Sequence, residues 1–160
     1  MKRKNYCPVC QKETEYTINI QETEYSKDDV TFSYKEKVPV CSKCGEELFV
    51  DSINKENQKT FENTYIKLFN IIPTKDIKEI LSKYNISKEN LSLILGFNQP
   101  YIERYLDGYI PAKENSELLR KILNSPELYL SYLNANKDKL DLLDYEKSKI
   151  QIEKLLKAKI

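Results

Sequence analysis

The chain has 160 residues and nearly balanced charge, with 26 lysines and arginines against 25 aspartates and glutamates. This length suits one or two domains, and the net charge does not indicate binding to nucleic acid or to a membrane surface. Histidine is absent, which excludes Ser-His-Asp and Cys-His catalysis and every histidine-containing metal site. Because a P-loop and a G-x-G-x-x-G motif are also absent, we expect that the protein is not an enzyme.

The sequence contains no apolar run near the ~18 residues that a membrane-spanning helix needs. The first residues, 1–6, are basic but are not followed by the apolar core of a signal peptide. We therefore expect an intracellular, cytoplasmic protein without a membrane partner.

All four cysteines fall in two C-x-x-C motifs, Cys7-Pro8-Val9-Cys10 and Cys41-Ser42-Lys43-Cys44, which are separated by thirty residues. Two residues between cysteines allow one turn to present both thiolates to a single ion, and two such turns complete a tetrahedral zinc site. We therefore predict a structural Zn²⁺ site formed by Cys7, Cys10, Cys41 and Cys44. Because protein atoms fill all four positions, this metal should stabilise the fold rather than take part in chemistry.

The same cysteines have three alternative interpretations. Two disulfides would suit a small secreted domain, which the amino terminus does not indicate. A redox C-x-x-C motif usually occurs singly beside a βαβ pattern, and no such pattern is found in this sequence. An iron–sulfur cluster can use the same four thiolates, so this alternative stays open.

Two runs between the cysteine motifs, 16–21 and 30–35, alternate apolar and polar residues. Period two with β-branched and aromatic side chains predicts half-buried strands, with Tyr16, Ile18, Ile20, Val30, Phe32 and Tyr34 on their buried faces. A polar turn at 26–29 would join them into a hairpin that returns the second cysteine motif to the first. Residues 1–50 thus form a predicted zinc-binding β domain, whose folding would depend on a metal-binding free energy of about 10–16 kcal/mol.

Acidic side chains of this hairpin allow two interpretations. They are a solvated face, or they form an acidic surface for a partner; they are Glu22, Glu24, Asp28 and Asp29.

A connecting helix is predicted within residues 51–73. Asp51 or Ser52 can cap it, and Pro73 should lie beyond its end. Apolar residues recur along it at spacings of three and four, which indicates a stripe that packs against a core. These residues are Phe61, Tyr65, Leu68 and Phe69.

Five short helices are predicted in the next domain, 74–135, beginning near residues 74, 88, 98, 112 and 126. Ser87 caps the second helix, and Gly96 suits the left-handed position at its end. Pro100 is allowed in the first turn of the third helix. A short helix, a glycine turn and a second short helix form the order of a helix-turn-helix DNA-binding unit.

The stretches Ile86–Ser92 and Gly96–Gly108 resemble the XRE-type helix-turn-helix, and Leu118–Leu128 is similar to the end of that module. Together with the two cysteine motifs, they resemble the MqsA-type (YgiT-type zinc finger) antitoxins over about residues 5–135. The resemblance implies a type II antitoxin that regulates its own transcription. Its zinc domain would bind the cognate toxin, and its helical domain would form a homodimer on double-stranded operator DNA.

The resemblance also implies a recognition helix over Asn98–Leu106. Gln99 and Arg104 would read bases, since Gln suits adenine and Arg suits guanine, and Lys88 would contact phosphate. The implied DNA-binding residues are Lys88, Asn98, Gln99, Tyr101 and Arg104.

Three residues depart from the family pattern in this region. Pro100 replaces a base-reading asparagine, Glu103 adds a carboxylate, and Leu106 replaces a glutamate. Cationic and anionic side chains are also equal in number between Lys75 and Ala135. An alternative function is therefore a protein-binding adaptor whose helix-turn-helix no longer binds DNA.

The last segment, 136–160, has an amphipathic helical pattern that includes Leu142, Tyr145 and Ile152. It should pack on its own domain, pair with a second chain, or lead into a further domain, as in similar antitoxins that continue into a Panacea domain. The predicted fold class is α+β: a zinc-bound β-hairpin domain joined by a helix to an all-α, five-helix XRE-like domain.

Overall fold

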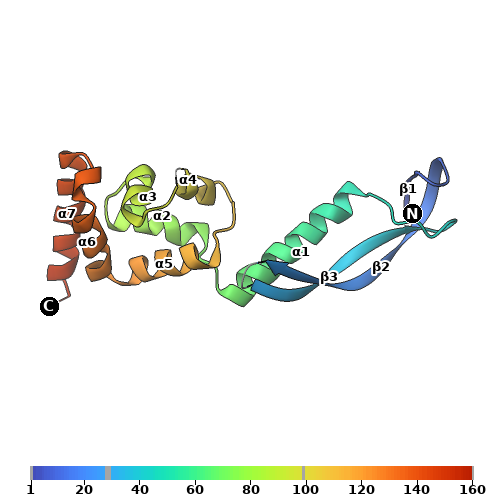
Figure 1. The fold of residues 1–160 in the computed structure, drawn as a ribbon, viewed down its shortest axis with the longest axis horizontal. Coiled ribbons are helices and arrows are strands. Elements are labelled where there is room, and N and C mark those ends of the chain that lie inside the picture. The colour runs from blue at the N-terminus through green and yellow to red at the C-terminus, as the bar shows by residue number, and fades with distance from the viewer. Residues whose placement is uncertain (1, 28–29, 99, 160) are drawn as a thin grey trace. The chain divides into compact units, whose positions relative to one another are not determined.

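The computed structural model describes residues 2–27, 30–98 and 100–159. The chain divides into two compact units, the hairpin unit (Met1–Leu68) and the helical unit (Phe69–Ile160). The described residues form a three-stranded antiparallel sheet followed by seven α-helices, which confirms the predicted α+β class (Figure 1). None of these helices combines the length and the apolar character needed to cross a bilayer.

The elements of the hairpin unit are β1 (Lys4–Cys7), β2 (Lys12–Lys27), β3 (Val30–Cys41) and α1 (Asp51–Phe69). The helical unit contains α2 (Thr74–Lys83), α3 (Lys88–Leu95), α4 (Tyr101–Leu106), α5 (Lys113–Asn124), α6 (Pro126–Ala135), the 3₁₀ turn η1 (Lys137–Lys139) and α7 (Leu142–Lys157).

Strands β2 and β3 form a long ribbon in continuous register, from Tyr16 opposite Cys41 to Lys27 opposite Val30. Both predicted strands lie within it. The ribbon extends further toward its tip than expected, because Ser26 pairs across the strands with Thr31 through their hydroxyls at 3.1 Å. The predicted turn at 26–29 is therefore wrong at Ser26 and Lys27, and Asp28 and Asp29 lie outside the described residues.

Helix α1 runs along one face of this ribbon, where aromatic side chains from both elements meet (Figure 1). The Phe61 ring of α1 lies 4.9 Å from that of Tyr25 and 5.4 Å from that of Phe32, measured between centroids. Phe32 and Tyr34 therefore face the core as predicted. The same register places Ile20 opposite Lys37 on the other face, and the prediction that Ile20 is half-buried is wrong because its side chain is 67% exposed.

The connecting helix ends before Pro73, as predicted, but its apolar stripe is only partly used. Phe61 and Tyr65 pack against Phe32 of the ribbon. Leu68, one turn further along, remains 58% exposed, so its assignment to core packing is wrong. The aromatic part of the stripe is what attaches α1 to the strands.

Helices α2, α3, α5 and α6 form where the sequence predicts them, and side-chain caps define where α3 and α6 begin. The Ser87 hydroxyl accepts the Asn90 N–H at 3.1 Å, and the Ser125 hydroxyl accepts the Leu128 N–H at 3.2 Å. Gly96 closes α3 at φ 72°, a left-handed conformation that glycine adopts at little cost. These caps delimit short helices around one buried core.

Helix α4 differs from its prediction because it begins at Tyr101, not near Asn98. A helix containing Asn98 would need a helical conformation in the residue before Pro100, which the proline ring disfavours. Pro100 instead occupies the N-cap position.

Helix α7 packs on α6 within the helical unit and is anchored by a buried polar network (Figure 1). The Ser148 hydroxyl bonds the Tyr129 hydroxyl and donates to the carbonyl oxygen of Tyr84 at 2.6 Å. The Tyr84 and Tyr129 rings stack at 3.9 Å, and the Tyr84 hydroxyl donates to the carbonyl of Ile122 at 2.6 Å. Four helices are thus joined through buried hydroxyls with satisfied hydrogen bonds.

Candidate metal centre

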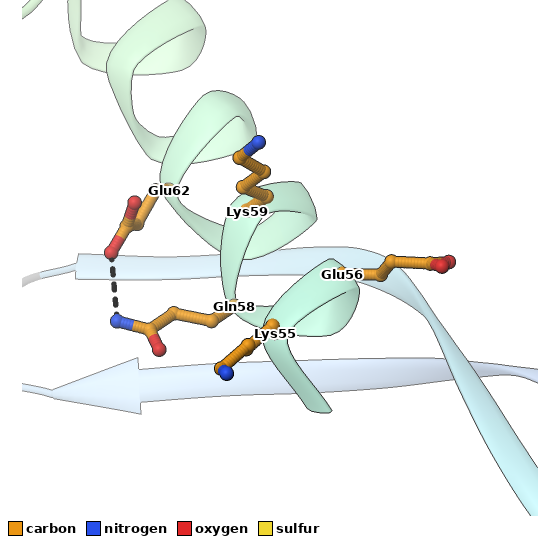
Figure 2. Close-up of a pocket in the computed structure, with 5 residues that line it drawn as sticks. All are labelled: Lys55, Glu56, Gln58, Lys59 and Glu62. Carbon is orange, nitrogen blue, oxygen red and sulfur yellow. Dashed lines mark hydrogen bonds between the residues drawn. The ribbon is translucent and has the colours of Figure 1, made fainter. Parts of the chain in front are cut away.

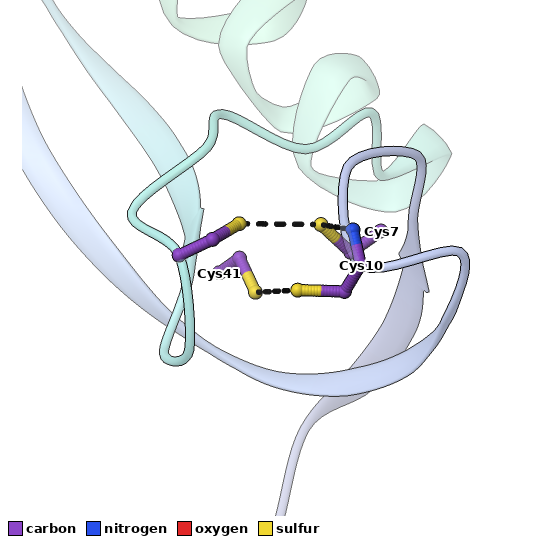
Figure 3. Close-up of side chains that lie close together, drawn as sticks. Cys7, Cys10 and Cys41 are labelled. Atoms are coloured by element: carbon purple, nitrogen blue, oxygen red, sulfur yellow. Dashed lines mark hydrogen bonds between the residues drawn. The ribbon is translucent and has the colours of Figure 1, made fainter.

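The four cysteines approach one another at the base of the ribbon because strand pairing brings the two C-x-x-C turns together. Cys7 ends β1 and Cys41 ends β3, while Cys10 and Cys44 lie in the turns that follow. Each turn closes with a left-handed residue, Gln11 at φ 53° and Gly45 at φ 79°. Figure 3 shows the resulting arrangement, with the sulfurs of the two turns facing one another.

The sulfur geometry fits a tetrahedral metal ion. All four Sγ atoms lie within 4.8 Å of one another. The Cys7–Cys44 sulfurs are 3.5 Å apart and the Cys10–Cys41 sulfurs 4.0 Å apart (Figure 3). Metal–sulfur bonds of about 2.3 Å at tetrahedral angles require sulfur separations of about 3.8 Å. Four free cysteines at these separations can hold one metal ion, as the spacing predicted.

Hydrogen bonds to the sulfurs support the thiolate form at one cysteine. The buried Thr14 hydroxyl lies 3.2 Å from the Cys41 sulfur, and the Lys43 N–H donates to the same sulfur at 3.4 Å. The Thr14 contact, followed by backbone N–H groups, lowers the pKa of Cys41 to about 6. Hydrogen bonding with Cys44 and burial raise the pKa of Cys10 to about 12. These contacts favour the thiolate at Cys41 and the thiol at Cys10, and a bound cation would favour ionisation of its sulfur ligands.

Sequence reasoning did not identify Thr14 as part of this centre. The sequence feature that could have indicated Thr14 is its position two residues before Tyr16, on the same face of β2. Tyr16 also packs against the cysteine cluster. Hydroxyl groups that contact metal ligands orient them and modulate metal affinity.

The arrangement leaves no coordination position for a substrate, since four sulfurs complete a tetrahedron. Cys7 and Cys41 are buried and pack with Leu48, whereas Cys44 is exposed. A metal at this position would connect β1, β3 and the turn before α1, so its role would be to stabilise this end of the hairpin unit.

The five residues implied in DNA binding lie in different environments. Lys88 is paired with Glu103, with 3.0 Å between Nζ and Oε1, and this carboxylate raises the pKa of Lys88. Asn98 is exposed but precedes α4, and Gln99 lies outside the described residues. The Tyr101 ring is half-buried and stacks on Tyr105 at 6.0 Å. Arg104 is exposed on α4, and no described residue pairs with its side chain.

A shallow depression of about 370 Å³ lies on the surface of α1 (Figure 2). All of its lining side chains belong to this one helix: Lys55, Glu56, Gln58, Lys59 and Glu62. Gln58 donates to Glu62 at 3.0 Å, and Glu56 pairs with Lys37 at 2.6 Å. Because it lacks an apolar wall from a second element, we assign it no function.

Comparison with protein families, curated proteins and solved structures found no match to this chain. The resemblance to MqsA-type antitoxins therefore depends on the cysteine motifs and the helical motifs of the sequence.

Proposed function

We propose that the protein is a zinc-stabilised, DNA-binding regulator of the antitoxin class. Its hairpin unit binds a partner protein, a cognate toxin, and its helical unit binds double-stranded operator DNA as a homodimer. The observation that carries the DNA-binding part is the pairing of α3 and α4 across the Gly96 turn, with Arg104 exposed on α4. This order and spacing suit a helix-turn-helix.

The packing of the two helices supports this proposal. Ile102 of α4 and Leu91 of α3 are both fully buried in the core of the helical unit. Phe97 N–H bonds the carbonyl of Ser92 at 2.9 Å, which fixes the direction of the chain as it leaves α3. A rigidly held α4 could present Arg104 to a base edge, where a bidentate contact to guanine is worth about 1–3 kcal/mol of discrimination.

Zinc is the metal we propose for the cysteine cluster. Four thiolates in a tetrahedron are typical of structural zinc, and an iron–sulfur cluster is the alternative for the same ligands. Metal analysis of purified protein separates the two: zinc gives a colourless protein with one ion per chain, whereas iron with inorganic sulfide would refute the assignment.

The DNA-binding part is tested by fluorescence anisotropy with the DNA upstream of the protein's own coding sequence. A repressor should bind with an affinity that falls steeply between about 50 and 200 mM salt. Arg104→Ala should weaken discrimination between this DNA and a scrambled duplex by about tenfold. Lys78 is an exposed cation on α2, so Lys78→Ala is the matched control. It should change neither the salt dependence of the affinity nor the discrimination between the two duplexes.

A second candidate function, a protein-binding adaptor, is favoured by the Lys88–Glu103 ion pair. This pair neutralises the cation that would contact phosphate, in a domain whose charges already balance. Absence of binding to the upstream DNA at low salt, by wild type and by Glu103→Gln alike, would favour the adaptor over the regulator.

A further inference from the structure

One edge of β2 has no neighbouring strand over most of its length in the described part of the hairpin unit. Strand β1 pairs only with Lys12–Glu15, and the Tyr16 N–H bonds the carbonyl of Arg3 at 3.1 Å. Beyond Tyr16 the only neighbour of β2 among the described strands is β3. One side of β2 is therefore an open edge along most of the ribbon.

The register identifies which backbone groups point toward this edge. Both backbone groups of Lys37 bond the side chain of Asn57, so they face away from β2. Ile20 is the cross-strand partner of Lys37. In an antiparallel pair, the backbone N–H and C=O groups of both residues point either toward the partner strand or away from it. The groups of Ile20 therefore point outward, as do those of every second residue along β2.

Five residues of β2 consequently carry outward N–H and C=O groups for which the described structure provides no protein partner: Ile18, Ile20, Glu22, Glu24 and Ser26. The opposite edge, on β3, is covered at its cysteine end. Asn57 bonds Lys37, Pro39 has no N–H to donate, and Leu48 N–H bonds the Pro39 carbonyl at 2.8 Å. Opposite Ile18 and Ile20, therefore, only the β2 edge can accept another strand.

The side chains along the open edge define the chemistry of a fitting strand. Ile20 is largely exposed on the ribbon face that α1 leaves free, and Glu22 and Glu24 are exposed on the same face. An added strand would place alternate side chains beside them. Apolar side chains suit the neighbourhood of Ile20, and cationic side chains suit the two carboxylates.

We propose that the β2 edge from Ile18 to Glu24 binds an extended, basic segment of a partner protein, which adds a strand to the ribbon. This inference rests on the proposed role of the hairpin unit in binding a partner and specifies the surface used. Backbone hydrogen bonds would supply affinity, and the carboxylates would supply selectivity for cationic side chains.

A second copy of the chain is disfavoured as the occupant. Antiparallel pairing of two β2 edges centred on Glu22 would place this carboxylate opposite its equivalent in the other copy. Antiparallel pairing centred one residue further along, on Thr23, would place Glu22 opposite Glu24. Like charges directly opposite one another destabilise strand pairs, so self-association in these two registers is disfavoured.

The test uses the full chain loaded with zinc and a fluorescein-labelled peptide of about eight residues, a common strand length, in which lysine and valine alternate. Anisotropy measures its affinity, with a glutamate–valine peptide as the charge control.

Glu24 and Ser33 are cross-strand partners with backbone N–H groups on opposite edges. Glu24→Pro removes a donor from the β2 edge, Ser33→Pro removes one from the β3 edge, and Glu24→Gln reports the loss of charge alone.

We expect Glu24→Pro to bind about tenfold more weakly than Glu24→Gln, and Ser33→Pro to bind within about twofold of wild type. Equal affinities of Glu24→Pro and Glu24→Gln, or no binding of the lysine peptide by wild type, would overturn the inference. Circular dichroism and metal content confirm that the proline variants fold.

Amide hydrogen exchange of wild type provides a readout that does not depend on any variant. Binding of the lysine peptide should slow exchange at Ile18, Ile20, Glu22 and Glu24, whereas the intervening amides are already protected by β3. Uniform or absent protection contradicts strand addition. Operator binding, measured on the same preparations, is independent: if it persists while the peptide results fail, the regulator stands and only the edge inference falls.

Discussion

Asn57 of α1 acts toward Lys37 of β3 as a neighbouring strand would. Its Oδ1 accepts the Lys37 N–H at 2.9 Å, and its Nδ2 donates to the Lys37 carbonyl at 2.8 Å. The amide side chain is itself buried, and the helix is fixed to the edge of the ribbon at this point. A single side chain thereby satisfies both edge groups of one residue and attaches α1 to β3.

Replacement of Asn57 should therefore destabilise the hairpin unit. Asn57→Leu leaves the Lys37 N–H and carbonyl without their partner, which should cost about 1–3 kcal/mol of unfolding free energy. Urea denaturation of the zinc-loaded protein, followed by circular dichroism, measures this loss. Gln58→Leu makes the same chemical change at the next, exposed position and should change stability by less than about 0.5 kcal/mol.

Removal of the metal should unfold the base of the hairpin unit and leave the helical unit folded. Among the described residues, the buried hydrophobic cluster around the cysteines consists of Cys7, Cys41 and Leu48, with Cys10, Tyr16 and Val50 packed against it. Zinc binding, by comparison, contributes about 10–16 kcal/mol in small zinc domains. A chelator should therefore broaden the NMR signals of 1–48 and preserve those of α2–α7. Retention of native signals around Cys7 and Cys41 in fully chelated protein would contradict a structural metal.

Thr14→Val should weaken metal binding without changing the shape of the site. Valine is close in size but lacks the hydroxyl that contacts the Cys41 sulfur at 3.2 Å. Loss of such a contact typically costs about 10–100-fold in metal affinity, measurable by competition with a chromogenic chelator. Thr17→Val, the same change at an exposed position of β2, should leave affinity unchanged, and equal effects of both variants would exclude a specific role for Thr14.

Glu103→Gln should strengthen DNA binding if the helical unit is a DNA-binding regulator. The substitution releases Lys88 from its ion pair and removes a negative charge from α4. Affinity should rise severalfold at low salt, and the slope of log affinity against log salt should become steeper by about one. Glu79→Gln removes an exposed carboxylate from α2 and serves as the control. Identical slopes for wild type and Glu103→Gln would show that Lys88 does not reach phosphate.

The stability of the helical unit should decrease at high pH because of Tyr129. Burial raises the pKa of this phenol from 10.0 to about 12, with a small opposing effect from Ser148. Because the pKa of Tyr129 is higher in the folded state than in the unfolded state, the buried neutral phenol stabilises the fold fully below pH 10. This stabilisation is lost as pH rises from 10 toward 12. Urea midpoints between these pH values should fall faster for wild type than for Tyr129→Phe. Parallel curves would show that the pKa of Tyr129 is the same in the folded and unfolded states, which would contradict the effect of burial.

The cysteine cluster was predictable because its geometry follows from local spacing. Cys7, Cys10, Cys41 and Cys44 needed only two tight turns and one hairpin to meet. The helix boundaries at Ser87 and Gly96 were predictable for the same reason, since caps act within one turn. The predictions that depended on cysteine spacing and on helix caps were thus confirmed.

Features that depended on distant partners could not be read from the sequence. Strand β1 has only four residues and is stabilised by pairing with Lys12–Glu15 rather than by its own pattern. Ile20 has the alternation of a buried residue, but the register with β3 turns it away from α1. Lys88 and Glu103 are 15 positions apart, and only the packing of α3 on α4 brings their charges together.

The bond from Ser148 to the Tyr84 carbonyl joins positions 64 residues apart and has a consequence for synthesis on the ribosome. Helix α2 emerges well before α7, so the Tyr84 carbonyl lacks its permanent hydrogen-bond donor until translation has passed Ser148. All four cysteines of the cluster, by contrast, have been translated once Cys44 is added. A nascent chain can therefore assemble this cluster at one end while the other end still awaits the helix that completes its core.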